Sequence, residues 1–467
     1  MSHRFDPVVL REYDVRGTVG RTLHAADGYA IGRCFATRVA ETGGGRVVVG
    51  RDGRLTSEML EAALVRGLTE GGVDVVRIGL GPSPMLYFAE AVLPDMAGGI
   101  QVTGSHNPRD DNGFKMVLRH RSLHGAGIAA LGALGLSGAW SRGAGGVESL
   151  DLQDTYVDRL LQGQAPGRAP GFRIGWDCGS GAAGPVVERL TARLPGEHHL
   201  LHTVPDGHFP HHHPDPSVAA NLVDLQRLVA ARGLDFGLAF DGDGDRIGAV
   251  DGRGRVLWGD QILMLLAERL LLEWPGATVV GDVKSSRALF DRIVERGGTP
   301  VMGRTGHSSL KTLMAETGAP LAGEMSGHIF FGQEYYGFDD ALYAAVRLIR
   351  AIDLSGRSLT ELHDAMPRLI STPDLRIPVP ESRKWAVIDS VAARLAAAGE
   401  AVDTTDGLRV AMGTGWWLLR ASNTQAAVTV RAEAAEAGEL AALLAGVEAH
   451  LAACGVPASL SGGDSPT

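Results

Sequence analysis

RVVVGRD at residues 46–52 is an apolar run that ends in aspartate, and the chain repeats it as FRIGWD at 172–177 and TVVGD at 278–282. A second apolar run follows each of them after roughly 20 to 30 residues, the span of a βαβ crossover, and a third run closes each group. The second runs are VDVVRIG at 73–79, HHLLHTV at 198–204 and TPVMG at 299–303, and the third runs are GGIQVTG at 98–104, FGLAFDG at 236–242 and PLAGEMS at 320–326. Strands that alternate with helix-like stretches predict three related α/β units with mixed, largely parallel sheets.

The chain is expected to form four domains, because 467 residues, 45% of them apolar, are too many for one core. The first boundary follows the Gly/Ser-rich stretch LSGAWSRGAGG at 136–146, and the last lies in the Pro-rich stretch STPDLRIPVPES at 371–382. Beyond it the three-strand pattern stops, and strands around 416–433 precede an Ala/Leu/Glu helix at 435–452. The expected domains are 1–150, 151–255, 256–370 and 371–467, the last of them an α+β unit.

Charge and cysteine content exclude several classes of protein. The formal net charge of −10 argues against a nucleic-acid partner, so anionic substrates must be met by local positive groups. Cys34, Cys178 and Cys454 are odd in number and far apart, which argues against a disulfide framework or a zinc site and favours the reducing cytoplasm. The N-terminus is too charged for a signal peptide. The most apolar helix-like run, 261–274, is too short and too charged to span a membrane.

Polar loops follow the third strand of each repeated unit: TGSHNPRDDNGFK at 103–115, DGDGDR at 241–246 and GEMSGH at 323–328. Ligands of open α/β sheets bind at the carboxyl ends of the strands. Three chemically distinct loops in equivalent positions therefore predict that the units face one common cleft.

The first loop carries a candidate nucleophile, Ser105. Gly104 frees the backbone before it and Asn107 with Pro108 forces a turn after it, which holds the hydroxyl out of the sheet. A serine hydroxyl is a poor nucleophile unless a base, a metal or a covalent group activates it. His106 and Lys115 are candidates for a base or for phosphate contacts. An ordinary Ser/Asn/Pro turn is the alternative for SHNP alone, but the full thirteen-residue string is more specific.

The second loop is a candidate metal site. Asp241, Asp243 and Asp245 alternate with glycines, and three carboxylates this close require a cation. Oxygen ligands favour Mg²⁺ or Ca²⁺. An EF-hand is excluded, because its sixth and twelfth positions would be Arg246 and Gly252 in place of Gly and Glu. A solvated acidic turn is the remaining alternative.

The third loop is suited to a sugar. The carboxylate of Glu324 can accept hydrogen bonds from paired sugar hydroxyls, and Ser326 and His328 offer further contacts. His328 is also a candidate base, because an unperturbed imidazole titrates near neutral pH.

Three further segments carry weaker signals. RASNT at 420–424 is either an anion cradle of one Arg with three small polar side chains or a plain hairpin turn. Lys284 and His307 follow the first and second strands of the third unit, where each could line the same cleft. The run His211, His212 and His213 is similar to a metal-binding tag, but its Pro-rich setting, FPHHHPDPS, favours a fixed connecting loop.

Taken together, YDVRG at 13–17, TGSHNPRDDNGFK, DGDGDR, GEMSGH and RASNT resemble, in the same order, the motifs of the α-D-phosphohexomutase family, and within it the bacterial phosphomannomutase/phosphoglucomutase branch. The resemblance covers nearly the whole chain. It implies three related mixed-sheet α/β domains and a smaller C-terminal α+β (TBP-like) domain around a central cleft.

The resemblance also implies roles for individual residues. Ser105 would carry the phosphoryl group, and its phosphate would hold Mg²⁺ together with Asp241, Asp243 and Asp245. Arg16, His106, Lys115 and Arg246 would surround the transferred group, with Lys115, Arg16 and then His328 as candidates for the base. Tyr13, His307, Glu324, Ser326 and His328 would bind the sugar. Arg420, Ser422, Asn423 and Thr424 would hold the phosphate that does not react, with Lys284 nearby.

The implied reaction interconverts hexose 1-phosphate and hexose 6-phosphate, of mannose, glucose or both, in a cytoplasmic monomer or weak dimer. Phosphoserine gives a hexose 1,6-bisphosphate, which also serves as the activator. The chain has Gln425 and Ala426 where the family often has Glu-Pro, and Met325 favours the mannose/glucose branch over the glucosamine branch, which usually has Gln. The alternatives are a phosphoglucosamine mutase, a sugar-phosphate phosphatase and a silent binding protein.

Overall fold

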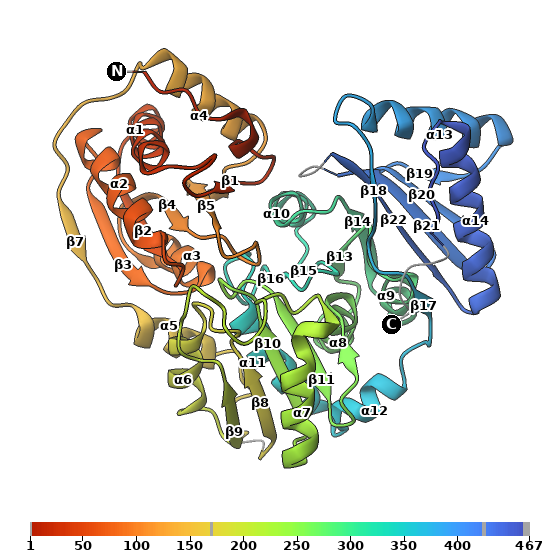
Figure 1. The fold of residues 1–467 in the computed structure, drawn as a ribbon. Helices are drawn as coiled ribbons and strands as arrows, with labels where there is room; N and C mark the ends of the chain where they lie inside the picture. The colour runs from red at the N-terminus through yellow and green to blue at the C-terminus, as the bar shows by residue number, and fades with distance from the viewer. Residues whose placement is uncertain (1, 169–170, 423–425, 461–467) are drawn as a thin grey trace.

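The computed structural model describes residues 2–168, 171–422 and 426–460, and it forms four units, each built on its own sheet. The N-terminal unit holds strands β1–β7, the second unit β8–β12, the third unit β13–β16 and the C-terminal unit β17–β22. Figure 1 shows the N-terminal and C-terminal units on opposite sides of the molecule, with the second and third units between them. This architecture confirms the predicted fold class.

The N-terminal unit is a mixed sheet with the strand order β1-β5-β4-β2-β3-β7, in which β6 pairs with β5. The central strands β2, β3 and β4 are parallel because helices connect them, and β5 runs antiparallel to β4. The strands are β1 (Val15–Thr18), β2 (Arg46–Arg51), β3 (Val75–Leu80), β4 (Met96–Val102), β5 (Asp111–Leu118), β6 (Arg121–Ser122) and β7 (Val147–Ser149), and the helices are α1 (Ala25–Glu41), α2 (Ser57–Glu70), α3 (Ser83–Val92) and α4 (Ala126–Ser137).

The second unit repeats this plan. Its strands β8 (Arg173–Asp177), β9 (Glu197–Leu201) and β10 (Phe236–Phe240) are parallel, and β11 (Ile247–Asp251) runs antiparallel to β10. Its remaining elements are β12 (Val256–Leu257), α5 (Gln153–Leu161), α6 (Gly184–Thr191) and α7 (Val223–Arg232). The third unit has the order β14-β13-β15-β16, with only the last strand antiparallel. It contains β13 (Thr278–Asp282), β14 (Thr299–Gly303), β15 (Leu321–Gly323), β16 (Ile329–Phe331), α8 (Gly259–Glu273), α9 (Arg287–Glu295), α10 (His307–Thr317), α11 (Ala341–Ser355) and α12 (Leu359–Asp364).

The threefold repeat in the sequence is therefore a repeat of structure. In each unit a predicted polar loop joins the third strand to an antiparallel fourth strand: β4 to β5, β10 to β11 and β15 to β16. Some predicted runs extend beyond the strands, since β9 ends at Leu201 and β15 at Gly323. Both runs continue into turns beyond these strand ends, where single backbone hydrogen bonds remain: the N–H of Ser180 donates to the carbonyl of His202 at 2.8 Å, and the N–H of Glu324 donates to the carbonyl of His328 at 2.9 Å.

The C-terminal unit is an antiparallel sheet with both of its long helices, α13 and α14, on one face, as Figure 1 shows. Its elements are β17 (Ile370–Ser371), β18 (Leu375–Pro378), β19 (Val402–Asp403), β20 (Leu408–Met412), β21 (Gly415–Ala421), β22 (Ala427–Ala434), α13 (Lys384–Ala398) and α14 (Ala437–Ala453). Side chains alternate along β21: Trp417 and Leu419 pack under the helices, whereas Trp416 and Leu418 pack against Val283 of the third unit. The predicted α+β unit is thus docked on its neighbour by the second face of its sheet.

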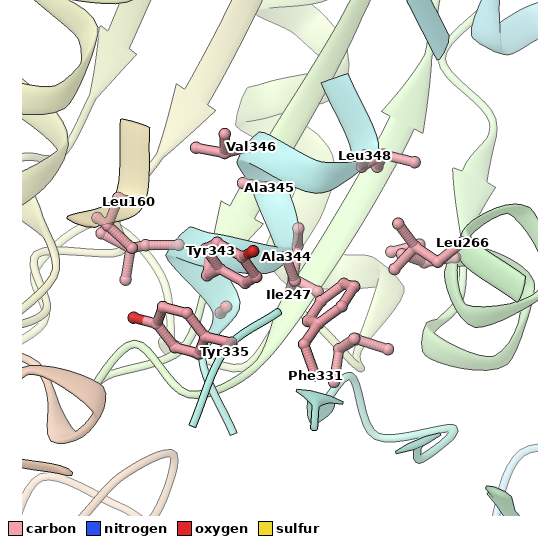
Figure 2. Close-up of a cluster of buried hydrophobic side chains, with 14 of the residues drawn as sticks. Leu160, Ile247, Leu266, Phe331, Tyr335, Tyr343, Ala344, Ala345, Val346 and Leu348 are labelled. Atoms are coloured by element: carbon pink, nitrogen blue, oxygen red, sulfur yellow. The ribbon is translucent and has the colours of Figure 1, made fainter. Parts of the chain in front are cut away.

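A continuous hydrophobic core joins the first three units and fixes the loops between them. Helix α11 lies among α5, α8 and β11, and Figure 2 shows Tyr335 and Tyr343 stacked beside Leu160, with Phe331 and Ile247 on the other side. Each fully buried side chain of this size contributes about 1.5–3 kcal/mol. Within the described ranges, no helix is both long enough and apolar enough to cross a membrane.

Candidate functional site

The polar loops of the N-terminal and second units meet at Ser105 and Asp241. The Ser105 hydroxyl donates a hydrogen bond of 2.8 Å to Oδ2 of Asp241, although 136 residues separate the two along the chain. Only 2% of Ser105 is exposed. Loops on two different sheets therefore bring the candidate nucleophile to the candidate metal site.

The backbone around Ser105 is held in a shape that few residues adopt. Ser105 has φ of +48°, in the left-handed region, which costs free energy for a residue with a Cβ. Its N–H donates to Oγ1 of Thr103 at 2.8 Å, and the Thr103 hydroxyl donates to Oδ2 of Asp52 at 2.8 Å. These bonds fix the hydroxyl of Ser105 towards the second unit.

Arg54, which was not predicted from the sequence, is the main support of this loop. Its buried guanidinium donates hydrogen bonds of 2.6–2.8 Å to four backbone carbonyls of the loop, those of Ser105, Asn107, Pro108 and Asp111. Nε of Arg54 lies 3.3 Å from Oδ2 of Asp52. One side chain thus satisfies carbonyls that the tight turn leaves without ladder partners. Asp52 at the end of the first repeated run was the available sequence signal.

Asp241, Asp243 and Asp245 are buried together, with one carboxylate oxygen from each lying within 4.8 Å of the others. Burial, and then the charges of Asp245 and Asp243, raise the pKa of Asp241 well above its ordinary value. In the part of the chain that the structure describes, Oδ1 of Asp243 is buried and has no hydrogen-bond donor. An orphaned oxygen in an all-carboxylate cluster fits a divalent cation. The predicted trio is therefore a group that could hold a metal ion.

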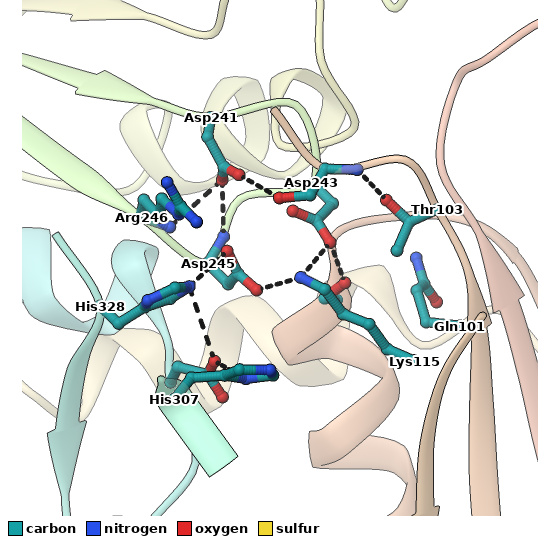
Figure 3. Close-up of polar contacts among 12 residues, drawn as sticks. Gln101, Thr103, Lys115, Asp241, Asp243, Asp245, Arg246, His307 and His328 are labelled. Carbon is teal, nitrogen blue, oxygen red and sulfur yellow. Dashed lines mark hydrogen bonds and ion pairs between the residues drawn. The ribbon is translucent and has the colours of Figure 1, made fainter. Parts of the chain in front are cut away.

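Lys115 reaches this trio from β5 of the N-terminal unit, as Figure 3 shows. Its ammonium group donates to Oδ2 of Asp243 at 2.7 Å and forms a second, shorter ion pair with Asp245. Burial lowers the pKa of Lys115, but Asp243 and Asp245 outweigh it and leave the pKa well above its usual value. Lys115 is therefore positively charged in this arrangement, beside the Ser105 loop.

Three more of the predicted residues lie around Ser105 and Asp241. Nδ1 of His106 lies 3.2 Å from the Ser105 hydroxyl oxygen. Burial, and then Arg246 and Arg16, hold the pKa of His106 well below its ordinary value, so the imidazole is neutral. Arg16 donates to the carbonyl of Gly104 at 2.8 Å and to Oδ1 of Asn107 at 2.9 Å. The backbone N–H of Arg246 donates to Oδ1 of Asp241 at 3.2 Å.

The third unit contributes Glu324, Ser326 and His328 to the same place. The imidazole of His328 lies between two carboxylates, with Nδ1 2.7 Å from Oε2 of Glu324 and Nε2 3.2 Å from Oδ1 of Asp245. Burial lowers the pKa of His328, but the negative charges of Asp245 and Glu324 outweigh burial and raise the pKa to about 10. Burial raises the pKa of Glu324, but the charge of His328 and its hydrogen bond outweigh burial and lower this pKa to about 2. Ser326 donates to Oε2 of Glu324 at 2.7 Å. A protonated imidazole is a poor base, so this arrangement favours a donor role for His328.

Asp339 connects these groups to His307 and was also missed from the sequence. Its Oδ2 lies 2.9 Å from Nδ1 of His307, and its Oδ1 accepts a 2.9 Å hydrogen bond from Lys311. The rings of His307 and His328 stack with centroids 5.4 Å apart. Figure 3 shows the ring of His328 beside Asp245, with the ring of His307 farther from it.

Tyr13 crosses from the N-terminal unit to the third unit. Its hydroxyl donates a 2.9 Å hydrogen bond to the carbonyl of Thr305, and its ring meets that of His307 edge-on. The predicted sugar-binding residue Tyr13 thus lies at a contact between units on opposite sides of the site.

The C-terminal unit brings Arg420 to the third unit. Arg420 forms a 3.0 Å ion pair with Asp406, and Oδ2 of Asp406 accepts a 3.1 Å hydrogen bond from the N–H of Thr305. The carbonyl of Ser422 accepts from the buried ammonium of Lys384 at 2.6 Å. Lys284 is ion-paired with Asp374, at the junction of the two units. The predicted residues Asn423 and Thr424 lie outside the described residues.

Comparison with known protein families gives four matches along the chain. They are described as Phosphoglucomutase/phosphomannomutase, alpha/beta/alpha domain I over residues 8–124, domain II over 154–254, domain III over 258–369, and the C-terminal domain over 375–450. Each match falls on one of the four sheets.

Individual relatives agree over most of their length. A phosphomannomutase/phosphoglucomutase of Pseudomonas putida is 43% identical over 433 residues, 92% of this chain and 93% of that protein. A phosphoglucomutase of Neisseria gonorrhoeae is 43% identical over 432 residues, 91% of this chain and 93% of that protein. A solved structure from Burkholderia thailandensis, a phosphoglucomutase/phosphomannomutase family protein, superposes with a TM-score of 0.92 at 41% identity, covering 97% of this chain and 99% of that one.

Proposed function

The chain belongs to the phosphoglucomutase/phosphomannomutase family, and we propose that its hexose phosphate mutase activity proceeds through a phosphoserine at Ser105. The observation that carries this role is the 2.8 Å hydrogen bond from the Ser105 hydroxyl to Asp241. It supports a nucleophile that shares a cation with carboxylates of another unit.

The proposed cation is Mg²⁺, held by Asp241, Asp243, Asp245 and a phosphate oxygen on Ser105. The donor set consists only of oxygen, and the buried Oδ1 of Asp243 has no hydrogen-bond donor among the described residues. When bound, the ion would neutralise charge on the phosphoryl group during its transfer. The positive charges of the Lys115 and Arg246 side chains would also stabilise the negative charge on the phosphoryl group during its transfer.

In the proposed reaction, a sugar hydroxyl attacks the phosphorus of phosphoserine. The bond between phosphorus and Ser105 Oγ breaks, a new bond forms to the sugar oxygen, and the hydroxyl proton passes to a base. The product is a hexose 1,6-bisphosphate, which turns round and returns its other phosphoryl group to Ser105. Added bisphosphate would phosphorylate a bare Ser105 by the same reverse step, which is why we propose it as the activator.

The base is assigned by elimination among the predicted candidates. Arg16 is a guanidinium that donates to two oxygens, and Lys115 and His328 are held protonated by carboxylates. His106 is the neutral group within 3.2 Å of the Ser105 oxygen. We therefore propose His106 as the proton acceptor close to Ser105, with Lys115 taking this role only if substrate separates it from Asp243 and Asp245.

Sugar recognition is assigned to Glu324, Ser326, His307 and Tyr13. Glu324 keeps a negative charge at neutral pH, because His328 stabilises it, so it can accept hydrogen bonds from paired hydroxyls. The phosphate that does not react is assigned to Arg420, Ser422, Asn423 and Thr424, with Lys284 nearby. Mannose and glucose phosphates are the proposed substrates, as in the names of the relatives that are 42–43% identical.

The proposal also includes a cellular compartment and an oligomeric state. The enzyme works in the cytoplasm, which agrees with the absence of a disulfide among Cys34, Cys178 and Cys454, all of them free. We also propose that it works as a monomer or weak dimer. Sedimentation velocity at several protein concentrations would test the second statement.

The decisive experiment is a Ser105→Ala variant with a Ser390→Ala control, in which the changed hydroxyl lies on the exposed face of α13. Both are assayed with mannose 1-phosphate, glucose 1-phosphate and glucosamine 1-phosphate, with Mg²⁺ and added hexose 1,6-bisphosphate. Loss of all isomerised product in Ser105→Ala alone supports the proposal. Turnover of Ser105→Ala at the wild-type rate refutes it. Faster turnover of the glucosamine substrate by the wild type would indicate the phosphoglucosamine branch, and phosphate release without isomerised product would indicate a phosphatase.

A further inference from the structure

A second cluster of metal-ligand side chains lies in the second unit, apart from the aspartate trio. It consists of Asp177, His202 and His212, whose ligand atoms lie within 4.8 Å of one another. We propose that these three side chains bind a divalent transition-metal ion such as Zn²⁺. The site includes one member of the histidine run at 211–213, which the reaction proposed above does not use.

The contacts of His212 leave one ring nitrogen aimed at a carboxylate. Its Nδ1 lies 3.0 Å from the carbonyl oxygen of His213, and its Nε2 lies 3.0 Å from Oδ2 of Asp177. A carbonyl can only accept, so Nδ1 carries the hydrogen. Nε2 then faces Asp177 across a position that either a proton or a metal ion can fill. A ring N–H that donates to a backbone carbonyl is also the usual support of a metal-bound histidine.

His202 supplies an unpaired nitrogen at the same position. Its Nε2 is buried and, among the described residues, has no hydrogen-bond partner, since Oδ2 of Asp224 is 3.6 Å away. Only 13% of the His202 side chain is exposed. A buried polar atom left without a partner costs about 1–3 kcal/mol. A metal ion coordinated by Nε2 removes this cost, which a structural role for the ring does not.

The donor set selects a different metal from that of the catalytic trio. Two imidazole nitrogens and one carboxylate oxygen suit Zn²⁺ and its neighbours in the first transition row, whereas three carboxylates suit Mg²⁺. Metal–ligand bonds of about 2.1 Å require the ligand atoms to lie within roughly 4 Å of one another. The three side chains therefore need only small rotations to close on the ion. The ring of His211 stacks on His202 with centroids 3.9 Å apart and covers the cluster from outside.

The cluster borders the catalytic loops without being part of them. Nε2 of His213 contacts the carbonyl of His106, and the carbonyl of Pro214 accepts a 3.2 Å hydrogen bond from the N–H of Gly242. The loop that carries His212 thus backs both the Ser105 turn and the aspartate loop. A metal ion at Asp177, His202 and His212 would stiffen this loop, and its role is structural because no ligand of the cluster contacts Ser105.

The test uses metal-free, full-length protein without an affinity tag, in excess Mg²⁺ to occupy the aspartate trio. Zn²⁺ is titrated by calorimetry, and Co²⁺ serves as a visible-absorption probe of a site with imidazole ligands. His202→Asn is the test variant, because asparagine tolerates the φ of +53° at this position. His208→Ala is the matched control, since His208 is an exposed histidine of the same connection, bonded to Asp206.

The proposal predicts one Zn²⁺ per wild-type chain and per His208→Ala chain, with affinity at least roughly tenfold weaker in His202→Asn. Zn²⁺ should raise the Tm of the wild type but not of His202→Asn, and mutase activity with Mg²⁺ should be equal in all three proteins. An Asp243→Asn chain should still bind Zn²⁺. Equal affinity in His202→Asn, loss of binding in Asp243→Asn, or a wild type without Zn²⁺ uptake and without a Co²⁺ spectrum would each overturn the proposal.

Discussion

Replacing Arg54 with lysine tests whether the shape of the nucleophile loop depends on one side chain. Lysine keeps the positive charge beside Asp52 but loses the planar fork, so it can reach at most two of the four carbonyls that Arg54 holds. Two lost hydrogen bonds from a charged donor are worth roughly 4 kcal/mol in total. One of the four carbonyls belongs to Ser105, whose backbone is already strained at φ of +48°.

We expect Arg54→Lys to lower kcat at least about a hundredfold, because a nucleophile displaced by an ångström loses this much. KM should change little, since the phosphate that does not react is proposed to bind to the C-terminal unit, away from the Ser105 loop. Tm should fall by about 4 °C, because the unfolding entropy of a chain of 467 residues is about 1 kcal/mol/K. A coupled assay of glucose 6-phosphate formation and differential scanning calorimetry measure the two effects.

Arg51→Lys is the control for the loss of an arginine fork. Arg51 ends β2, close to Arg54, but its ion pairs are with Glu58 and Glu61, away from the Ser105 loop. If Arg54→Lys keeps kcat within about twofold of the wild type, or if Arg51→Lys loses as much activity, Arg54 does not position the nucleophile.

Three further variants test the charges of the site. Asp241→Asn should raise the Tm of chelator-treated protein, because a pKa raised above its unfolded value means that the ionised carboxylate destabilises the fold at neutral pH. The variant should also lose the activity that Mg²⁺ restores to the wild type. An unchanged Tm would show that the three carboxylates do not repel one another. His328→Gln should destabilise chelator-treated protein by a few kcal/mol at about pH 6 and progressively less towards pH 10. A raised pKa stabilises the fold fully below the unfolded pKa, and this stability is lost as pH rises through the folded pKa of about 10. A difference in Tm that does not vary with pH would contradict the ion pairs of His328. Tyr13→Phe should raise KM roughly fivefold and leave kcat within about twofold of the wild type, because one hydrogen bond between units is lost. An unchanged KM would show that Tyr13 is not part of the substrate site.

The sequence predicts most of the fold because each repeated unit is built from successive segments of the chain. Each apolar run has the length of a strand, and the loops 103–115, 241–246 and 323–328 follow the third strand of their units as expected. The meeting of Ser105 with Asp241 was predictable for the same reason, since equivalent loops of repeated units face one another. The strand ends at Leu201 and Gly323 were less predictable, because apolar residues continue into turns.

The supporting residues of the site were not predictable, because their roles exist only in tertiary structure. Asp52 marks the strand end just before Arg54, but the sequence does not indicate that Arg54 has four carbonyl partners. Asp339 lies in an aromatic-rich loop, and only folding brings it to His307 and Lys311. His202 lies near His198 and His199 in the sequence, but only folding places Asp177 of β8 and His212 of the 211–213 loop beside it. Long-range polar contacts of this kind have no period in the sequence.

The charges at the site explain how an acidic chain can handle a dianionic group. The carboxylates of Asp241, Asp243 and Asp245 are offset in part by the ammonium group of Lys115, which contacts Asp243 and Asp245. The guanidinium of Arg246 also offsets them, since burial lowers its pKa but Asp215, Asp241 and Asp245 outweigh burial and raise it. Phosphorylation of Ser105 would add about two negative charges within hydrogen-bonding distance of Asp241, and a divalent cation would add two positive ones. In the proposed cycle each therefore increases the affinity for the other, by reciprocal linkage. The net charge of −10 is then no obstacle to phosphosugar binding, because the balance that matters is set by buried groups within a few ångströms of Ser105.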